Sequence, residues 1–267
     1  MISHLTKNFR VHKLLLVGML AFMYLPIFLL IALSFSQDPY TLFPLEFTME
    51  SYAEVFDGEY NQEVLNSLRI GFGSGAISMV VGAAAAWGVT RYRFRFRYAV
   101  ITIFVLPLIV PTLITGIGSS LLHDRITGLP SSVNLAMITQ SVRGSAFAFL
   151  IMMAQLNQYP VELDNAAKVY GATARQRFVE VTLPIVWGAL LGAFLLATII
   201  SFNDLNLTFF TVGSSGTIPT LTFNQMRYGL SASLFALSAL IAILSLGIVF
   251  SLSLFIEFSG IVGSDDG

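Results

Sequence analysis

The chain has 267 residues, of which 55% are hydrophobic and 11% are charged, and its formal net charge is −1. This composition differs strongly from that of a soluble globular domain and predicts an integral membrane protein. A net charge close to zero provides no general attraction to nucleic acid, so we expect no nucleic-acid partner. Without cysteine the chain forms no disulfide or thiolate metal site, and its 3 histidines are too scattered to predict a metal centre.

Six apolar segments are long enough to cross a bilayer, which takes about 20 residues of helix. Arg143, in the fourth segment, is the only charged residue within them. In chain order the segments cover residues 14–35, 70–90, 98–122, 133–156, 183–203 and 230–256. They predict one all-α membrane domain over residues 1–267, since a membrane β-barrel would show short alternating segments instead.

The first segment follows a basic stretch and could be mistaken for a secretory signal. Lys7, Arg10 and Lys13 precede it. Its apolar core is longer than the roughly 7–15 residues of a signal sequence, so we expect it to remain as the first transmembrane helix.

Lysine and arginine are unevenly divided between the two sides of the predicted bundle. One side carries Lys7, Arg10, Lys13, Arg91, Arg93, Arg95, Arg97, Lys168, Arg175 and Arg177. The other side carries only Arg69, Arg125 and Arg227. Because basic loops stay inside, this asymmetry predicts that both termini are cytoplasmic.

The second and third helices contain features that affect packing. Residues 91–98, between them, alternate arginine with aromatic residues, which favours arginines that reach lipid headgroups. In the third helix Pro107 and Pro111 each remove a backbone hydrogen bond, so we expect a kink.

Two glycine pairs at a spacing of four residues occur in the membrane segments. Gly71 and Gly75 lie in the second helix, and Gly188 and Gly192 lie in the fifth. Small residues at this spacing let two helices approach closely. Each pair is suited either to packing within this chain or to contact with a second membrane subunit.

A polar segment, residues 160–182, separates the fourth and fifth helices. Pro160 suits the first turn of a helix, on which Leu163, Ala166, Ala167 and Tyr170 form one apolar face. This face either docks into a groove on a partner or lies on the lipid surface, and two central alanines favour the partner because alanine is a poor lipid anchor.

The same segment contains a second helix signal. Gly171 can adopt a positive φ and end the first helix. Thr173 with Gln176 forms a capping box that starts another helix. The segment therefore predicts a cytoplasmic helix–turn–helix.

This segment resembles the E-A-A-x3-G-x9-I-x-L-P motif of bacterial ABC importer permeases of the type I, binding-protein-dependent family. Ala166, Ala167, Gly171, Leu183 and Pro184 match it at its spacing, and Val181 replaces isoleucine. Asn165 stands where the family has glutamate, and Asp164 or Glu162 could supply the charge instead. Residues 91–98 and 201–204 look most like the second permease of spermidine/putrescine systems.

The resemblance implies a type I importer permease fold in the bacterial inner membrane. It implies a second permease, two ATPase subunits and a periplasmic binding protein as partners, with ATP and Mg bound by the ATPase and no cofactor bound by this chain. The residues expected to couple to the ATPase are Glu162, Asp164, Asn165, Ala166, Ala167, Tyr170 and Gly171. ATP binding would then drive a rocking motion of the bundle.

Polar residues inside membrane helices are costly and usually face a cavity or a partner. Gln140 and Arg143 share one face of the fourth helix, and Ser201, Asn203 and Asp204 lie near the outer end of the fifth. These residues either line a substrate path, with the carboxylate binding an ammonium group, or form a structural Arg143–Asp204 ion pair. The outer segment 206–229 is either a contact for the binding protein or a simple connection.

The sequence thus predicts a permease of an ATP-driven importer for a small polar solute, such as a polyamine or an amino-acid-like zwitterion. It has no G-x-x-x-x-G-K-[ST] loop, so it is not the ATPase itself. The alternative is an ion-coupled secondary transporter, which should show acidic residues in its core, whereas only Asp204 is available. No nucleophile–base motif is found, so we expect no enzyme and no catalytic residue.

Overall fold

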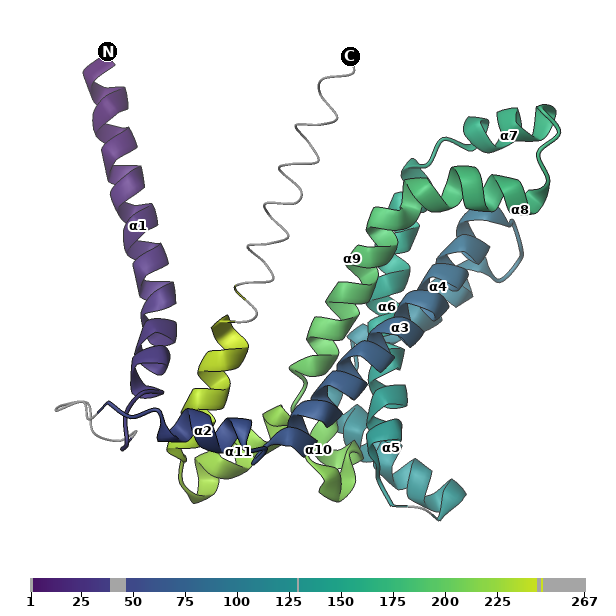
Figure 1. Cartoon of the computed structure of the whole chain (residues 1–267). Coiled ribbons are helices and arrows are strands. Elements are labelled where there is room, and N and C mark those ends of the chain that lie inside the picture. The colour runs from purple at the N-terminus through teal and green to yellow at the C-terminus, as the bar shows by residue number, and fades with distance from the viewer. Residues whose placement is uncertain (1, 39–46, 129, 244–245, 247–267) are drawn as a thin grey trace. The chain divides into compact units, whose positions relative to one another are not determined.

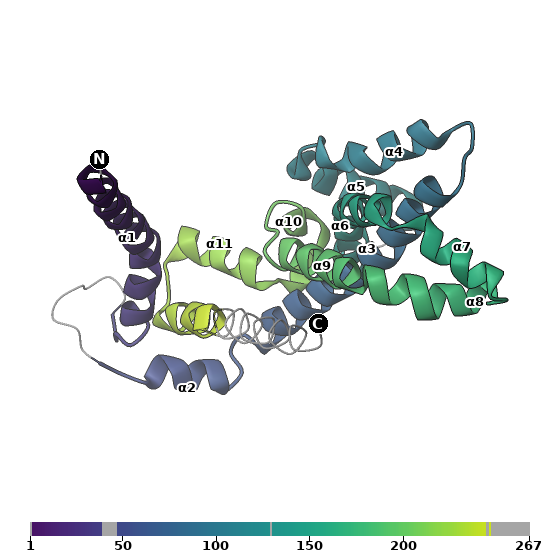
Figure 2. The same cartoon turned by 90° about the horizontal axis from the view of Figure 1, so that it is seen from above.

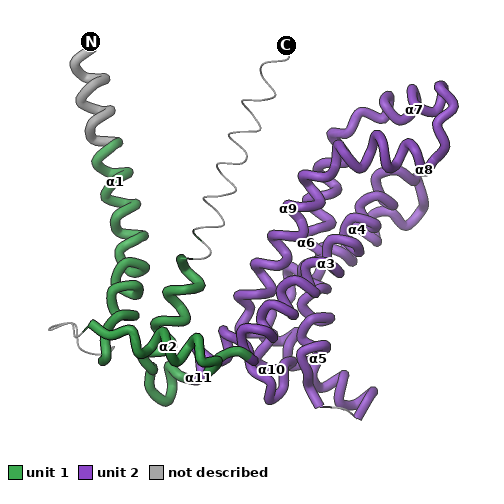
Figure 3. Tube along the Cα trace, viewed as in Figure 1, with its two compact units in different colours: residues 1–61, 225–267 green, residues 62–224 purple. Residues whose placement is uncertain are grey.

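The computed structural model describes residues 2–38, 47–128, 130–243 and 246 (Figure 1). Within these residues the chain is helical, apart from an isolated antiparallel bridge between Ser36 and Phe47. The chain divides into two compact units, residues 1–61 with 225–267 and residues 62–224 (Figure 3). We describe each unit separately.

The first unit contains α1 (Ile2–Leu33), α2 (Glu50–Phe56) and a helix over Ala232–Ile243. In the apolar part of α1, Lys13–Leu33, no residue of the most apolar stretch is fully buried by the described part of the chain, which leaves most of this surface for lipid or another helix. At its end the Ser34 hydroxyl lies 2.6 Å from the Tyr52 hydroxyl, which attaches α2.

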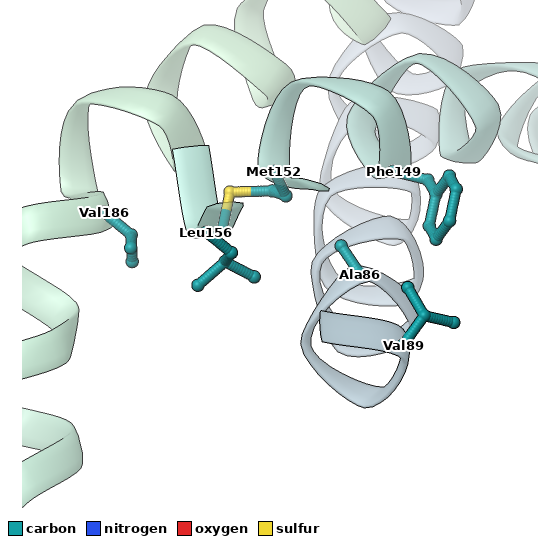
Figure 4. Close-up of a cluster of buried hydrophobic side chains, with 6 residues drawn as sticks. All are labelled: Ala86, Val89, Phe149, Met152, Leu156 and Val186. Atoms are coloured by element: carbon teal, nitrogen blue, oxygen red, sulfur yellow. The ribbon is translucent and has the colours of Figure 1, made fainter. Parts of the chain in front are cut away.

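The core of the second unit is a bundle of three long helices, α3 (Asn61–Arg91), α6 (Val133–Gln158) and α9 (Leu183–Phe202) (Figures 1 and 2). Two serines of α3 bond directly to the α6 backbone, Ser74 to the Met137 carbonyl and Ser78 to the Ser141 carbonyl. One apolar cluster joins all three helices and consists of Ala86, Val89, Phe149, Met152, Leu156 and Val186 (Figure 4).

Small residues allow α3 to approach its neighbours. A Cβ atom at Gly82 would lie 2.7 Å from the Phe149 backbone nitrogen, so α3 and α6 touch backbone to backbone here. A Cβ atom at Gly75 would lie 3.1 Å from the Phe194 carbonyl oxygen on α9. Only glycine fits where backbones approach this closely.

The two glycine pairs therefore differ. Gly71 and Gly75 pack against α9 within the chain. A Cβ atom at Gly188 or Gly192 would meet nothing within 4 Å among the described residues. The sequence left both uses open for both pairs, and the structure separates them.

The third predicted span is broken rather than merely kinked. α4 (Arg97–Val105) and the 3-10 turn η1 (Leu106–Leu108) are bent by 101° against α5 (Thr112–Thr127). Pro111 directly precedes α5, and a proline there disfavours the helical conformation of the residue before it. The prediction of one helix over 98–122 is corrected to two helical segments that meet at this bend.

The other spans follow the sequence with shifted ends. The described residues contain four helices long and apolar enough to cross a membrane, or five when the bent pair counts as one. α3 begins at Asn61, well before the predicted residue 70. The sixth predicted span, 230–256, begins with a helix over Ala232–Ile243, and residues 244–245 and 247–256 lie outside the described residues.

Candidate functional site

The segment between α6 and α9 forms the predicted helix–turn–helix. α7 (Val161–Val169) is followed by α8 (Ala174–Gln176), which leads into η2 (Arg177–Thr182). Gly171 has φ +86° and makes the turn that the sequence predicts. The capping box is present: the Thr173 hydroxyl accepts a bond from the Gln176 amide nitrogen, and the Gln176 side chain accepts one from the Thr173 amide.

The sequence did not predict that η2 would be a π-helix. π-helical turns are rare and occur mainly at functional positions. The turn ends at Leu183, next to Pro184, which lacks the N–H group that would continue an α-helical ladder. Pro184 of the motif was the available sequence signal for a change in helix type. It does not indicate at which residue the π-helical turn begins.

In the coupling segment, residues 160–182, the apolar side chains of α7 and of the residue that follows it are largely exposed. No residue of α7 is buried. Val169 is 86% exposed and Tyr170 is 91% exposed, while Val161 and Leu163 are each 46% exposed. An exposed apolar surface on a helix outside the membrane spans is typical of a docking site for another protein.

The predicted charged residues of this segment differ in their contacts. Asp164 accepts a bond of 2.8 Å from the Arg177 guanidinium, so its carboxylate ties α7 to η2. Glu162 and Asn165 are both exposed. Of the two carboxylates expected to replace the missing glutamate, only Glu162 therefore presents an exposed charge to a partner. Ala166 is also exposed, and Ala167 is half-buried.

A second group of polar residues joins α6 to the end of α9. The Arg143 guanidinium lies 3.7 Å from Asp204 Oδ2, and the other carboxylate oxygen accepts a bond of 2.7 Å from the Leu207 amide. The Gln140 amide donates to the Thr208 hydroxyl at the start of α10 (Thr208–Thr211). The predicted ion pair is thus present, and Asp204 also caps the turn that follows α9.

This group is nearly closed in the present conformation. Gln140, Arg143, Ser201 and Asp204 line a cavity of about 10 Å³, which has room for at most one water molecule. At 3.7 Å the guanidinium and the carboxylate are in ionic contact but beyond normal hydrogen-bond length. Arg143 Nε and Gln140 Oε1 are buried without a hydrogen-bond partner in the described part of the chain. The group therefore retains unused hydrogen-bonding capacity.

One predicted member lies outside this group. Asn203 is exposed, and its side chain donates to the Ile199 carbonyl of its own helix. Thr208, which the sequence did not identify, takes part instead. A threonine in a polar stretch after the membrane helix gives no signal by itself, because its partner Gln140 lies far away in the chain.

The connection after α10 is tied to the start of α3. The Asn66 side chain donates to the carbonyls of Ser215 and Gly216, at 2.9 and 3.0 Å. The Ser67 hydroxyl accepts a bond of 2.9 Å from the Ile218 amide. These buried bonds fix the connection at this end of the bundle, which the sequence did not predict. No group of three or more possible metal ligands occurs among the described residues.

Comparison with known proteins places these features in context. Residues 78–258 match the family described as binding-protein-dependent transport system inner membrane component. The chain is 26% identical to the spermidine/putrescine transport system permease protein PotC of Haemophilus influenzae, over 86% of this chain and 90% of that protein. It is 28% identical to the putrescine transport system permease protein PotI of Escherichia coli K12, over 85% of this chain and 84% of that protein.

Solved structures share the fold. A bacterial ABC transporter involved in the import of the acidic polysaccharide alginate has a chain with a TM-score of 0.71 and 18% identity, covering 92% of this chain and 95% of that one. The methionine ABC transporter MetNI gives a TM-score of 0.60 and 18% identity, covering 75% and 94%. The predicted all-α membrane fold is thereby confirmed.

Proposed function

The chain belongs to the family of binding-protein-dependent transport system inner membrane components, and we propose that it is the subunit through which an importer moves a small solute with a primary ammonium group. The prediction of a type I ABC importer permease, most like the polyamine permeases, is confirmed by this family and these relatives. The ion-coupled transporter is not favoured. The family consists of inner-membrane transport subunits, and we propose that this member has no catalytic activity of its own.

The exposed apolar surface of α7 carries the proposal for coupling. Val169 and Tyr170 are almost fully exposed beside the motif residues Ala166 and Gly171. We propose that this helix docks into a groove on an ATPase subunit, which binds the ATP and Mg. Both termini would then lie in the cytoplasm, on the side of the basic loops.

The open face of α9 supports a second permease as partner. Gly188 and Gly192 leave room for another helix to approach, whereas Gly71 and Gly75 are already occupied. A periplasmic binding protein would deliver the solute on the opposite side from α7, and lipid would cover the remaining apolar surface.

The Arg143–Asp204 contact supports the choice of solute class. Relatives whose names give substrates include permeases for spermidine and putrescine and a putative one for 2-aminoethylphosphonate. All three solutes carry a primary ammonium group. We propose that this group replaces the guanidinium at Asp204 Oδ2, while Oδ1 keeps its bond to the Leu207 amide. The residues proposed to line this path are Gln140, Arg143, Ser201 and Asp204.

The proposal is tested by purifying the tagged chain from its native membrane in mild detergent and identifying its partners by mass spectrometry. We expect an ATPase and a second permease in stoichiometric amounts. The complex, in liposomes with its binding protein, should take up labelled putrescine only when ATP is present on the ATPase side. A chain that purifies alone, and moves putrescine without ATP, would contradict the proposal.

A further inference from the structure

Arg91, at the end of α3, is held between two aromatic rings. Its guanidinium carbon lies 4.3 Å from the centre of the Tyr159 ring and 5.2 Å from the Trp87 ring. Both distances fall within the roughly 6 Å range of a cation–π interaction. Its Nη2 is buried without a hydrogen-bond partner among the residues that the structure describes. The two ring faces are therefore stabilising contacts for this partly buried charge.

The two rings are attached to the coupling segment. Tyr159 is 4% exposed, directly follows α6, and has its hydroxyl 3.5 Å from the Thr182 hydroxyl in η2. Trp87 packs edge-on against Phe178 of η2, with ring centres 5.8 Å apart. Together with the Arg177–Asp164 ion pair, η2 is thus linked to α3, to the end of α6 and to α7.

The contacts of η2 lie beside an open apolar groove. Trp87, Phe178, Met152 and Leu183 are among the residues lining this groove, which has a volume of about 410 Å³, and Trp87 and Phe178 are exposed in it. Side chains beside an open groove are less constrained than those in a close-packed interior, so η2 has room to move against α3. A π-helical turn is also a position where helix register can change.

We infer that Arg91, stacked between Tyr159 and Trp87, is a positioning residue that transmits displacement of the coupling helix α7 to the membrane helix α3. A push on α7 reaches η2 through the Asp164–Arg177 pair. From η2 it reaches α3 by two routes, the direct contact of Phe178 with Trp87 and the contact of Tyr159 with Arg91. Without the Arg91 contact, only the edge-on Trp87–Phe178 contact remains, and less of the displacement reaches α3. This inference rests on the proposed docking of α7 to an ATPase.

The test compares transport per ATP hydrolysed in the purified holo-complex, reconstituted with its binding protein and labelled putrescine. We expect Arg91→Gln and Tyr159→Leu each to lower putrescine transported per ATP by about fivefold, with ATP hydrolysis retained, because the stacking energy is lost. The double variant should lose little more transport per ATP than either single variant, because both substitutions remove the same contact between Arg91 and Tyr159. Arg91→Lys, which keeps the charge but not the planar stack, should lie in between.

Two controls separate coupling from folding. Tyr159→Phe keeps the ring on Arg91 but removes the hydroxyl at Thr182, so its transport per ATP should fall less than that of Tyr159→Leu. Arg93→Gln removes an exposed arginine of the same loop and should also leave the ratio unchanged. A merely structural role for Arg91 would lower the amount of assembled complex and leave the ratio as it was.

The outcomes are distinguishable. An unchanged ratio in Arg91→Gln, Arg91→Lys and Tyr159→Leu, in a complex that contains the ATPase, would overturn the inference and leave the proposed function intact. A parental chain that assembles with no ATPase would overturn the proposed function and this inference with it.

Discussion

The two sides of α9 have similar apolar composition but different surroundings. One side is buried against α6 and the rest of the bundle through Val186, Ala193, Ala197 and Ser201. On the other side, a Cβ atom at Gly188 or Gly192 would meet nothing within 4 Å among the described residues. Hydrophobicity does not explain this difference, because lipid tails solvate an apolar side chain as well as a neighbouring helix does.

The difference in burial is explained by how closely the backbones of neighbouring helices can approach α9. On the buried side, α3 offers Gly71 and Gly75 to α9, and at Gly75 the helices approach so closely that a Cβ atom would lie 3.1 Å from the Phe194 carbonyl oxygen. The open side of α9 has the same glycine spacing but no partner with a matching surface among the residues that the structure describes. Close packing in a membrane therefore identifies which faces are internal, and unmatched small residues identify where a partner fits.

The largest effect is expected from filling the internal contact. In Gly82→Leu, the Cβ atom would lie 2.6 Å from the Ala148 Cβ and 2.7 Å from the Ser145 carbonyl oxygen. Backbone atoms cannot rotate away, so we expect a loss of about 3 kcal/mol or more in stability, at the upper end of overpacking costs. The loss is measured as a lower midpoint of thermal unfolding in detergent. Gly88→Leu on the same helix, where a Cβ meets nothing within 4 Å, should leave the midpoint nearly unchanged.

The next effect concerns the open face. In Gly188→Leu combined with Gly192→Leu, the chain itself should fold as before because nothing lies within 4 Å. Recovery of the second permease with this chain should fall by about tenfold, since leucine keeps the two helices apart. The measurement is the ratio of the two permeases after purification. Equal recovery would show that lipid, rather than a second permease, covers this face. Gly118→Leu on α5 is the matched control, because a Cβ atom there also meets nothing within 4 Å.

A comparable or smaller effect, on solute uptake, is expected from a change at Asp204, which lies just after the end of α9. Asp204→Asn keeps an oxygen for the Leu207 amide but removes the negative charge. We expect the KM for putrescine uptake to rise by about tenfold, the value of one charge-assisted bond, with ATP hydrolysis by the complex retained. An unchanged KM would assign the Arg143–Asp204 contact to structure alone. Asn203→Ala, outside the group, is the control.

The smallest effect is expected from one hydrogen bond across the internal contact. Ser78→Ala removes the 3.1 Å bond to the Ser141 carbonyl but leaves the small size that close packing needs. Stability should fall by about 1 kcal/mol, the usual net value of one such bond. The unfolding midpoint in detergent measures this loss. Thr115→Ala removes an exposed bond from the Thr115 hydroxyl to the Pro111 carbonyl, four residues earlier. This control should lower the unfolding midpoint less.

Features decided by neighbours along the chain could be predicted. The Thr173–Gln176 capping box, the turn at Gly171 and the helix after Pro160 all depend on contacts within a few residues, and all are present. The apolar spans follow from length and composition in the same way. The break near Pro111 was expected in position but not in size, because its 101° bend depends on what the two halves pack against.

Features decided by residues far apart in the chain could not be predicted. The sequence alone did not show that Gly75 is filled and Gly188 open, that Asp164 binds Arg177 rather than a partner, or that Gln140 contacts Thr208. The sequence determined where the helices and their caps lie, because short-range backbone bonding sets these. Only the tertiary structure decided which faces meet, because in a membrane that choice depends on shape matching between distant helices rather than on hydrophobicity.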